Sequence, residues 1–76
     1  MHVAHAARCG ACVAQMREGR DAGPHSELRL VKVERFQRAM RAEAYQEVVY
    51  ECERCSSRIM HTTDTNEFPP FWWFTD

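Results

Sequence analysis

The chain has 76 residues, of which 45% are hydrophobic and 28% charged, and its formal net charge is −1 at pH 7. This composition argues against global disorder, the near-neutral charge gives no overall attraction to nucleic acid, and no apolar run approaches the roughly 20 residues of a transmembrane helix. A chain this short buries only about 60% of the surface that its unfolded form exposes, so we expect it to need a disulfide, a metal ion or a partner chain for stability.

The N-terminal segment, residues 1–16, is mildly apolar but has no basic stretch before its apolar part. We therefore expect no secretory signal and a cytoplasmic location, where thiols stay reduced. His2 and His5 stand three positions apart near the first cysteines. They compete as metal ligands with His25 and His61, but we expect these two N-terminal histidines to be exposed on a loose terminus.

Three elements are predicted between residues 8 and 33. Residues 8–13 (RCGACV) form a tight cysteine turn, and residues 19–24 (GRDAGP) form a loop, because glycines and a proline interrupt the chain there. Residues 26–33 (SELRLVKV) are rich in leucine and β-branched residues, which predicts a strand.

Residues 33–48 (VERFQRAMRAEAYQEV) predict a helix of about three turns. Ala, Arg, Gln, Glu and Met are good helix formers. Apolar residues also recur there at helical spacing, at Val33, Phe36, Met40 and Ala44. The alternative is a long β-hairpin whose turn would fall in residues 38–44, although that segment contains no Gly, Asn, Asp or Pro.

The C-terminal part predicts a hairpin followed by an aromatic tail. Residues 47–53 form a strand, residues 57–63 form the returning strand, and two prolines keep the tail extended. The tail is either a lid on the sheet or a docking segment for a protein partner or a second copy, through Phe71, Trp72, Trp73 and Phe74. At least one Trp is expected to pack near Val48 and Tyr50, or against Phe36 and Met40.

Two CxxC motifs carry the chemistry of the sequence. A tight turn places two cysteine sulfurs on one side, and two such turns brought face to face supply four thiolates for a tetrahedral ion. In a reducing compartment this pattern predicts one zinc ion per chain, held by Cys9, Cys12, Cys52 and Cys55. Two disulfides, a tetrathiolate iron site and a thioredoxin-like redox pair are the alternatives.

The pattern resembles a zinc ribbon, a family in which two cysteine knuckles clamp one zinc ion. The segment 47–61 (EVVYECERCSSRIMH) is similar to the second half of that motif, and residues 8–16 (RCGACVAQM) are similar to the first. Knuckles of the family often carry Gly after the second cysteine, where this chain has Val13 and Ser56. The resemblance implies a small metal-stabilised domain with a short antiparallel sheet. With the helix predicted at 33–48 inserted between the knuckles, we expect an α+β zinc-ribbon domain over residues 1–67, followed by the tail at 68–76.

Four cysteines fill a tetrahedron, so the sequence predicts a structural site and not an enzyme. We expect an adaptor or regulator that binds a protein partner or itself, with no membrane and no small-molecule substrate. Arg8, Arg54 and Arg58 flank the cysteines and would offset the negative charge of a zinc tetrathiolate.

Two other functions stay open. The first is a nucleic-acid-binding, transcription-related zinc ribbon, with phosphate contacts from Arg35, Arg38 and Arg41. The second is a rubredoxin-like iron electron carrier, because tetrahedral sulfur also suits iron.

Overall fold

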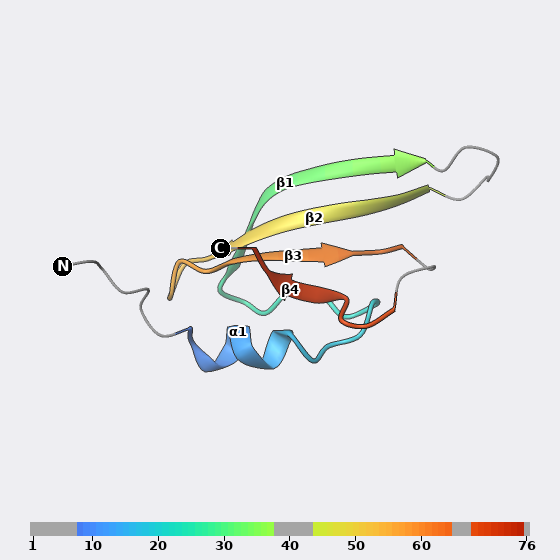
Figure 1. Cartoon of the computed structure of the whole chain (residues 1–76). Coiled ribbons are helices and arrows are strands. Elements are labelled where there is room, and N and C mark those ends of the chain that lie inside the picture. The colour runs from blue at the N-terminus through green and yellow to red at the C-terminus, as the bar shows by residue number, and fades with distance from the viewer. Residues whose placement is uncertain (1–7, 38–43, 65–67, 76) are drawn as a thin grey trace.

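The structure, a computed structural model, describes residues 8–37, 44–64 and 68–75. In these ranges a short helix precedes a four-stranded antiparallel sheet with the strand order β1-β2-β3-β4 (Figure 1). The elements are α1 Gly10–Gln15, β1 Leu28–Gln37, β2 Ala44–Cys52, β3 Arg58–Thr62 and β4 Trp72–Phe74. Each strand pairs with the next one in the sequence, so the sheet is a simple meander.

One face of the sheet carries the core; α1 lies below β4 in Figure 1 and contributes Cys12 to that core. Cross-strand partners share a face of an antiparallel pair. Tyr50 lies opposite Ile59, Val48 lies opposite His61, and His61 also lies opposite Trp72. The buried cluster at the centre consists of Cys12, Cys52, Ile59 and Trp72. Cys12 and Cys52 are therefore part of the hydrophobic core, and Cys9 and Cys55 pack against it.

Trp72 anchors the C-terminal tail in this core. Its side chain has no exposed surface, its ring stacks on His61 at 3.9 Å between centroids, and it stacks on Tyr50 at 5.8 Å. Its indole Nε1–H donates a hydrogen bond to the Gly19 carbonyl, at 2.9 Å. The expectation that a Trp packs beside Tyr50 is confirmed. In the same tail, Phe68 is 83% exposed.

The segment between α1 and β1 is fastened to the core by polar side chains. Gln15, which is buried, donates from Nε2 to the Gly23 carbonyl at 3.0 Å and accepts from the His25 N–H at 2.9 Å. His61 Nε2 lies 2.7 Å from the Arg20 carbonyl oxygen and donates to it. Because burial lowers the pKa of His61, its ring is neutral near pH 7 and carries the single proton that this bond needs.

The prediction of a helix over residues 33–48 is wrong, and the alternative prediction of a hairpin is confirmed. Val33 pairs with Val48 and Phe36 pairs with Tyr45 across β1 and β2. The rings of Phe36 and Tyr45 stack at 5.1 Å. Residues 48–50 (VVY) strongly favour a strand, and the pairing that they require overrides the weaker helix propensity of the preceding residues. The turn expected at 38–44 lies almost wholly in 38–43, outside the described residues.

The other predicted elements are placed as follows. The strand predicted at 26–33 is present and extends to Gln37. The hairpin predicted at 47–53 and 57–63 is confirmed as the end of β2 and β3. The first cysteine motif, predicted as a turn, opens α1. The tail contributes β4 to the same sheet as the rest of the chain.

Replacing Trp72 by Ala should lower the free energy of unfolding by about 3–5 kcal/mol, because it removes the largest fully buried side chain. The matched control is Trp73→Ala. Trp73 lies opposite Met60 on the other face and is only partly buried, so its loss should be clearly smaller. Denaturant unfolding measures both. Equal losses would contradict this view of the core.

Candidate metal centre

The four cysteines converge from two ends of the fold. Cys9 directly precedes α1, and Cys12 lies one helical turn further on. Cys52 ends β2, and Cys55 follows in the turn before β3. All four Sγ atoms lie within 4.8 Å of one another. Cys12 and Cys52 are buried, whereas Cys9 and Cys55 are partly exposed.

The sulfur spacing suits a metal ion better than disulfides. Cys9 Sγ lies 3.8 Å from Cys52 Sγ, and Cys12 Sγ lies 3.7 Å from Cys55 Sγ. A disulfide requires about 2.05 Å. A tetrahedral tetrathiolate with bonds of about 2.3 Å has sulfur–sulfur edges of about 3.8 Å. The cluster can therefore hold one metal ion with little movement.

The second motif forms a knuckle held by backbone hydrogen bonds. The Ser56 N–H donates to the Cys52 carbonyl, and the Cys52 N–H donates to the Ser57 carbonyl, both at 2.9 Å. The Arg54 N–H points at Cys52 Sγ, at 3.3 Å. Ser56 has a φ of 64°, in the left-handed region that favours glycine. The turn is thus closed around the sulfur of Cys52 at the cost of a strained Ser56.

The pKa values of two cysteines in the cluster, Cys12 and Cys55, are shifted in opposite directions. Burial, together with hydrogen bonds among the cysteines, raises the pKa of Cys12. Burial by itself would also raise the pKa of Cys55, but hydrogen bonds from the Cys9 backbone and from Ser57 lower it to about 6. One sulfur is therefore readily ionised while its neighbour holds its proton. A bound cation would reverse that preference at Cys12, because it stabilises the thiolate.

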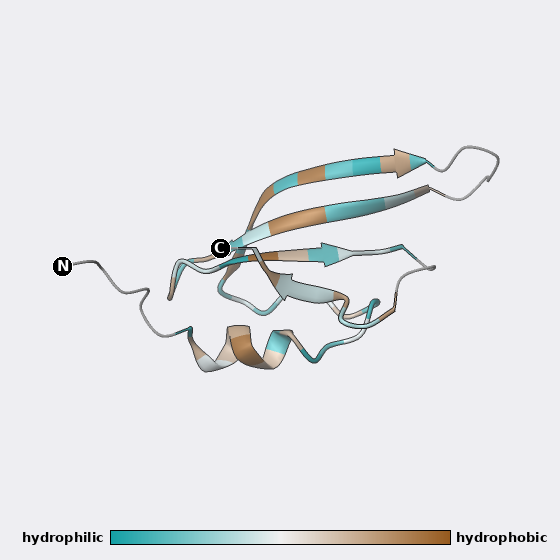
Figure 2. Ribbon diagram, in the orientation of Figure 1, coloured by the Kyte–Doolittle hydropathy of each residue, from teal (hydrophilic) through white to brown (hydrophobic). Residues whose placement is uncertain are grey.

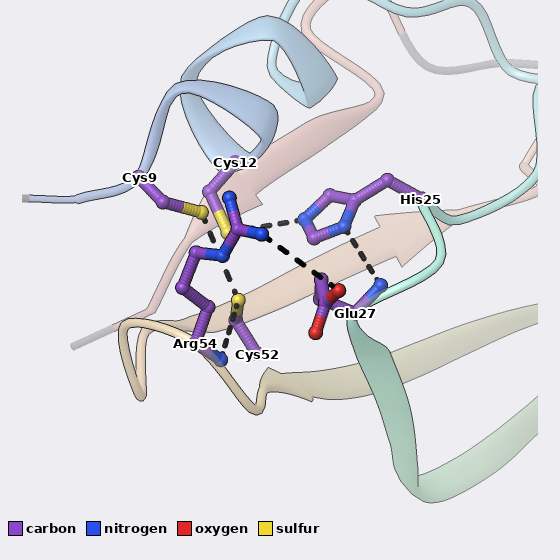
Figure 3. A network of polar contacts seen from close by, with 6 residues as sticks. All are labelled: Cys9, Cys12, His25, Glu27, Cys52 and Arg54. Carbon is purple, nitrogen blue, oxygen red and sulfur yellow. Dashed lines mark hydrogen bonds and ion pairs between the residues drawn. The ribbon is translucent and has the colours of Figure 1, made fainter.

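His25 contacts the sulfur cluster. In the sequence it is only one of four histidines that compete as metal ligands. Its Nε2 lies 3.2 Å from Cys12 Sγ, and the Glu27 N–H donates to its Nδ1 at 3.1 Å (Figure 3). Burial lowers the pKa of His25, so the ring is neutral. Because Nδ1 accepts, Nε2 carries the proton and donates it to the Cys12 sulfur. No local motif marks this role, since the contact joins a loop residue to the helix.

Glu27 and Arg54 link the two sides of the site. Arg54 Nη2 lies 4.0 Å from Glu27 Oε2 (Figure 3). The Glu53 N–H also donates to the Glu27 carbonyl, at 2.9 Å. The charged side chains of this pair are 63% and 39% exposed, so the ion pair itself adds little stability. The two other arginines near the cysteines have different contacts. Arg8 lies over the Phe74 ring at 3.8 Å, and Arg58 pairs with Glu51 at 3.6 Å.

Of the three predicted nucleic-acid contacts, only Arg35 lies in the described residues. Arg35 is exposed on β1, where its Nε donates to Gln46 Oε1 at 3.3 Å. Arg38 and Arg41 lie outside the described residues, as do His2 and His5. Three of the predicted docking residues form β4, and Phe71 directly precedes it. Trp72 is buried, and the others are partly buried: Phe71, Trp73 and Phe74.

Comparisons with protein-family models, with curated proteins and with solved structures found no match for this chain. In the part of the chain that the structure describes, no helix is long and apolar enough to cross a membrane.

Replacing Ser56 by Gly should raise the free energy of unfolding by about 0.5–1 kcal/mol, because glycine adopts the positive φ of this position without steric cost. Ser26→Gly is the matched control. Ser26 lies in a turn with ordinary backbone angles, so glycine there should lower stability through its greater freedom in the unfolded chain. Thermal unfolding compares the two variants. A stabilising Ser26→Gly or a destabilising Ser56→Gly would show that the backbone of Ser56 is not the source of strain in this turn.

Proposed function

We propose that this chain is a small structural zinc module of the zinc-ribbon type that acts through protein binding. The observation that carries the proposal is the convergence of four cysteine sulfurs within 4.8 Å. They come from two segments separated by 43 positions, counted from Cys9 to Cys52. A shared tetrahedral ion needs this arrangement, in which two distant motifs each supply two sulfurs to one cluster.

The chemistry of the donor set supports zinc. Four thiolates this close repel one another strongly, so they cannot all ionise without a cation. Zinc prefers four sulfur ligands in a tetrahedron, and a site closed by four protein ligands is structural and leaves no open position for a substrate. The proposed role is therefore non-catalytic. Binding of the ion would also supply the stability that a small core lacks.

The strand arrangement supports the zinc-ribbon type. In that family the second knuckle follows one strand and precedes its hairpin partner, and here Cys52 and Cys55 stand between β2 and β3. The first motif differs, because it opens a helix and not a strand hairpin. That helix packs beside the sheet, and the ion would join the two.

An adaptor or regulator role rests on the surface of the sheet. Large apolar side chains remain exposed along β1, which lies at the edge of the sheet: Leu30, Val31, Val33 and Phe36. Exposed apolar surface of this kind marks interaction sites in proteins.

Purified protein should contain one zinc ion per chain and should bind cobalt with the absorption of a tetrahedral tetrathiolate. Cys52→Ser should abolish stoichiometric binding, because it removes one of the buried ligands. Elemental analysis and cobalt titration measure this. A strong chelator should also unfold the chain, since the site and the fold form together.

The control for that variant is Glu53→Ser, which changes an exposed neighbour of Cys52 and leaves all four sulfurs in place. It should keep one ion per chain. A cooperative unfolding transition that is unchanged after complete removal of metal would contradict the structural role. Iron in place of zinc, seen as a visible ferric–thiolate colour, would contradict the assignment of the metal.

Replacing His25 by Phe should weaken zinc binding by about 10- to 100-fold, because the Cys12 sulfur loses its N–H donor. The thiolate-to-cobalt charge-transfer band should move to lower energy, since an unbonded thiolate gives up charge more easily. His61→Phe is the matched control: that residue is a buried histidine whose ring donates to a carbonyl oxygen and not to a sulfur. Its band should not move. Identical bands in both variants would show that His25 acts only through loop packing.

A further inference from the structure

β1 is a long edge strand that the rest of the described chain leaves uncovered. All of its residues after Leu28 are exposed, and it pairs with β2 on one side only. Exposed fractions are 55% for Leu30, 40% for Val31 and Val33, and 37% for Phe36. Figures 1 and 2 show the outer part of the β1–β2 hairpin projecting beyond α1 and β4, with apolar bands along it. A long, apolar edge of this kind is a template for pairing with another strand.

We propose that β1 pairs in antiparallel register with β1 of a second copy of this chain, so that two sheets join into one across a two-fold axis at Val33. A two-fold axis perpendicular to the sheet makes each contact occur twice and keeps the same faces of both sheets together. This inference rests on the proposed role as a protein-binding module and names its partner. The charges along β1 are what select a second copy.

Residues that pair across two strands must lie on the same face of the sheet, and this requirement limits the registers that the proposed β1–β1 pairing can take. From Lys32 to Gln37 the pairing with β2 is regular, so neighbouring residues alternate between the two faces of the sheet. Paired residues must share a face, and the two-fold axis must therefore pass through a residue of β1. Axes at Lys32, Glu34 or Arg35 would place identical charges directly opposite each other, which is destabilising. An axis at Phe36 would leave much of the exposed strand unpaired, and an axis before Lys32 would fall at the register shift between Leu30 and Lys32, where the regular alternation is interrupted.

The axis at Val33 gives the opposite result. It places Lys32 opposite Glu34 of the partner copy, and this contact occurs twice. Within one chain, Lys32 Nζ already lies 3.6 Å from Glu34 Oε2, and the two side chains are 57% and 50% exposed. Pairing the two copies would therefore build a square of four alternating charges on one face. On the other face, Val33 would meet its own copy and remove exposed apolar surface from water.

The proposed interface lies away from the metal centre. Cys52 pairs with Leu28, at the start of β1, whereas Val33 pairs with Val48 further along the hairpin. Association of two chains would thus leave the sulfur cluster uncovered. The metal content and the native mass can therefore be tested separately on the same protein.

The test is the native mass of the full chain, measured by analytical ultracentrifugation over a wide concentration series. The wild type should form a dimer. Lys32→Glu and Glu34→Lys should each weaken the dimer at least about tenfold, because each turns two attractive contacts into two repulsive ones. The double variant Lys32→Glu/Glu34→Lys should restore the wild-type dimer, since the charges again alternate. Arg17→Glu, an equal change of charge at an exposed residue beyond α1, should leave the dimer unchanged.

Thermal unfolding and zinc content are measured on the same samples, so that loss of the fold or of the metal is not mistaken for loss of the dimer. A wild type that stays monomeric with zinc bound would overturn the inference and leave the metal module intact. Single charge reversals that keep the full dimer, or a double variant that fails to restore it, would also overturn it. Loss of zinc from the wild type would instead count against the proposed function.

Discussion

The meeting of the two cysteine motifs is the contact on which the rest of the fold depends. It joins the start of α1 to the turn between β2 and β3, across 43 sequence positions from Cys9 to Cys52. A helix of six residues has no stability of its own in water, so α1 needs this tertiary contact to persist. Because Cys12 and Cys52 are both buried, the same contact forms the centre of the hydrophobic core.

The rest of the core is small and is completed by polar groups. Its buried hydrophobic residues are Cys12, Val48, Val49, Cys52, Ile59 and Trp72. The loop after α1 covers the sheet through carbonyl oxygens, which accept from the Trp72 indole and the His61 ring. Among the described residues, no buried side-chain nitrogen or oxygen lacks a hydrogen-bond partner. A core this small tolerates little loss, which is a physical reason for the proposed metal ion and the proposed partner chain.

The two ends of the sheet differ in how far their apolar residues are buried. At one end α1, the cysteine knuckle and β4 bury the ends of β2 and β3. At the other end β1 and the start of β2 form a hairpin whose apolar residues meet water, including Val33 and Phe36. The metal site would stabilise the first end and leave the second end available for contacts with another chain. This division separates the stabilising part of the molecule from its proposed binding surface.

The sequence alone determined the cysteine cluster and most of the strands. Each CxxC motif is a local turn, and closing the one chain segment between the two turns is enough to bring the four sulfurs together. The strands at 47–53 and 57–63 follow from the β-branched residues on either side of the second motif. The tail was also readable in part, because large aromatic rings such as Trp72 must be covered. These features depend on neighbouring residues, and local chemistry was enough to predict them.

Only the tertiary structure decided between helix and hairpin for residues 33–48. Their composition favours a helix, but Val33 and Phe36 pair with Val48 and Tyr45 on the neighbouring strand. This pairing depends on contacts between residues that are not adjacent in the sequence. The role of His25 was hidden for the same reason. Its hydrogen bond to Cys12 exists because Gln15 and the Glu27 N–H hold the loop in place. Contacts between distant segments are set by the packing of the whole chain, which no local pattern in the sequence records.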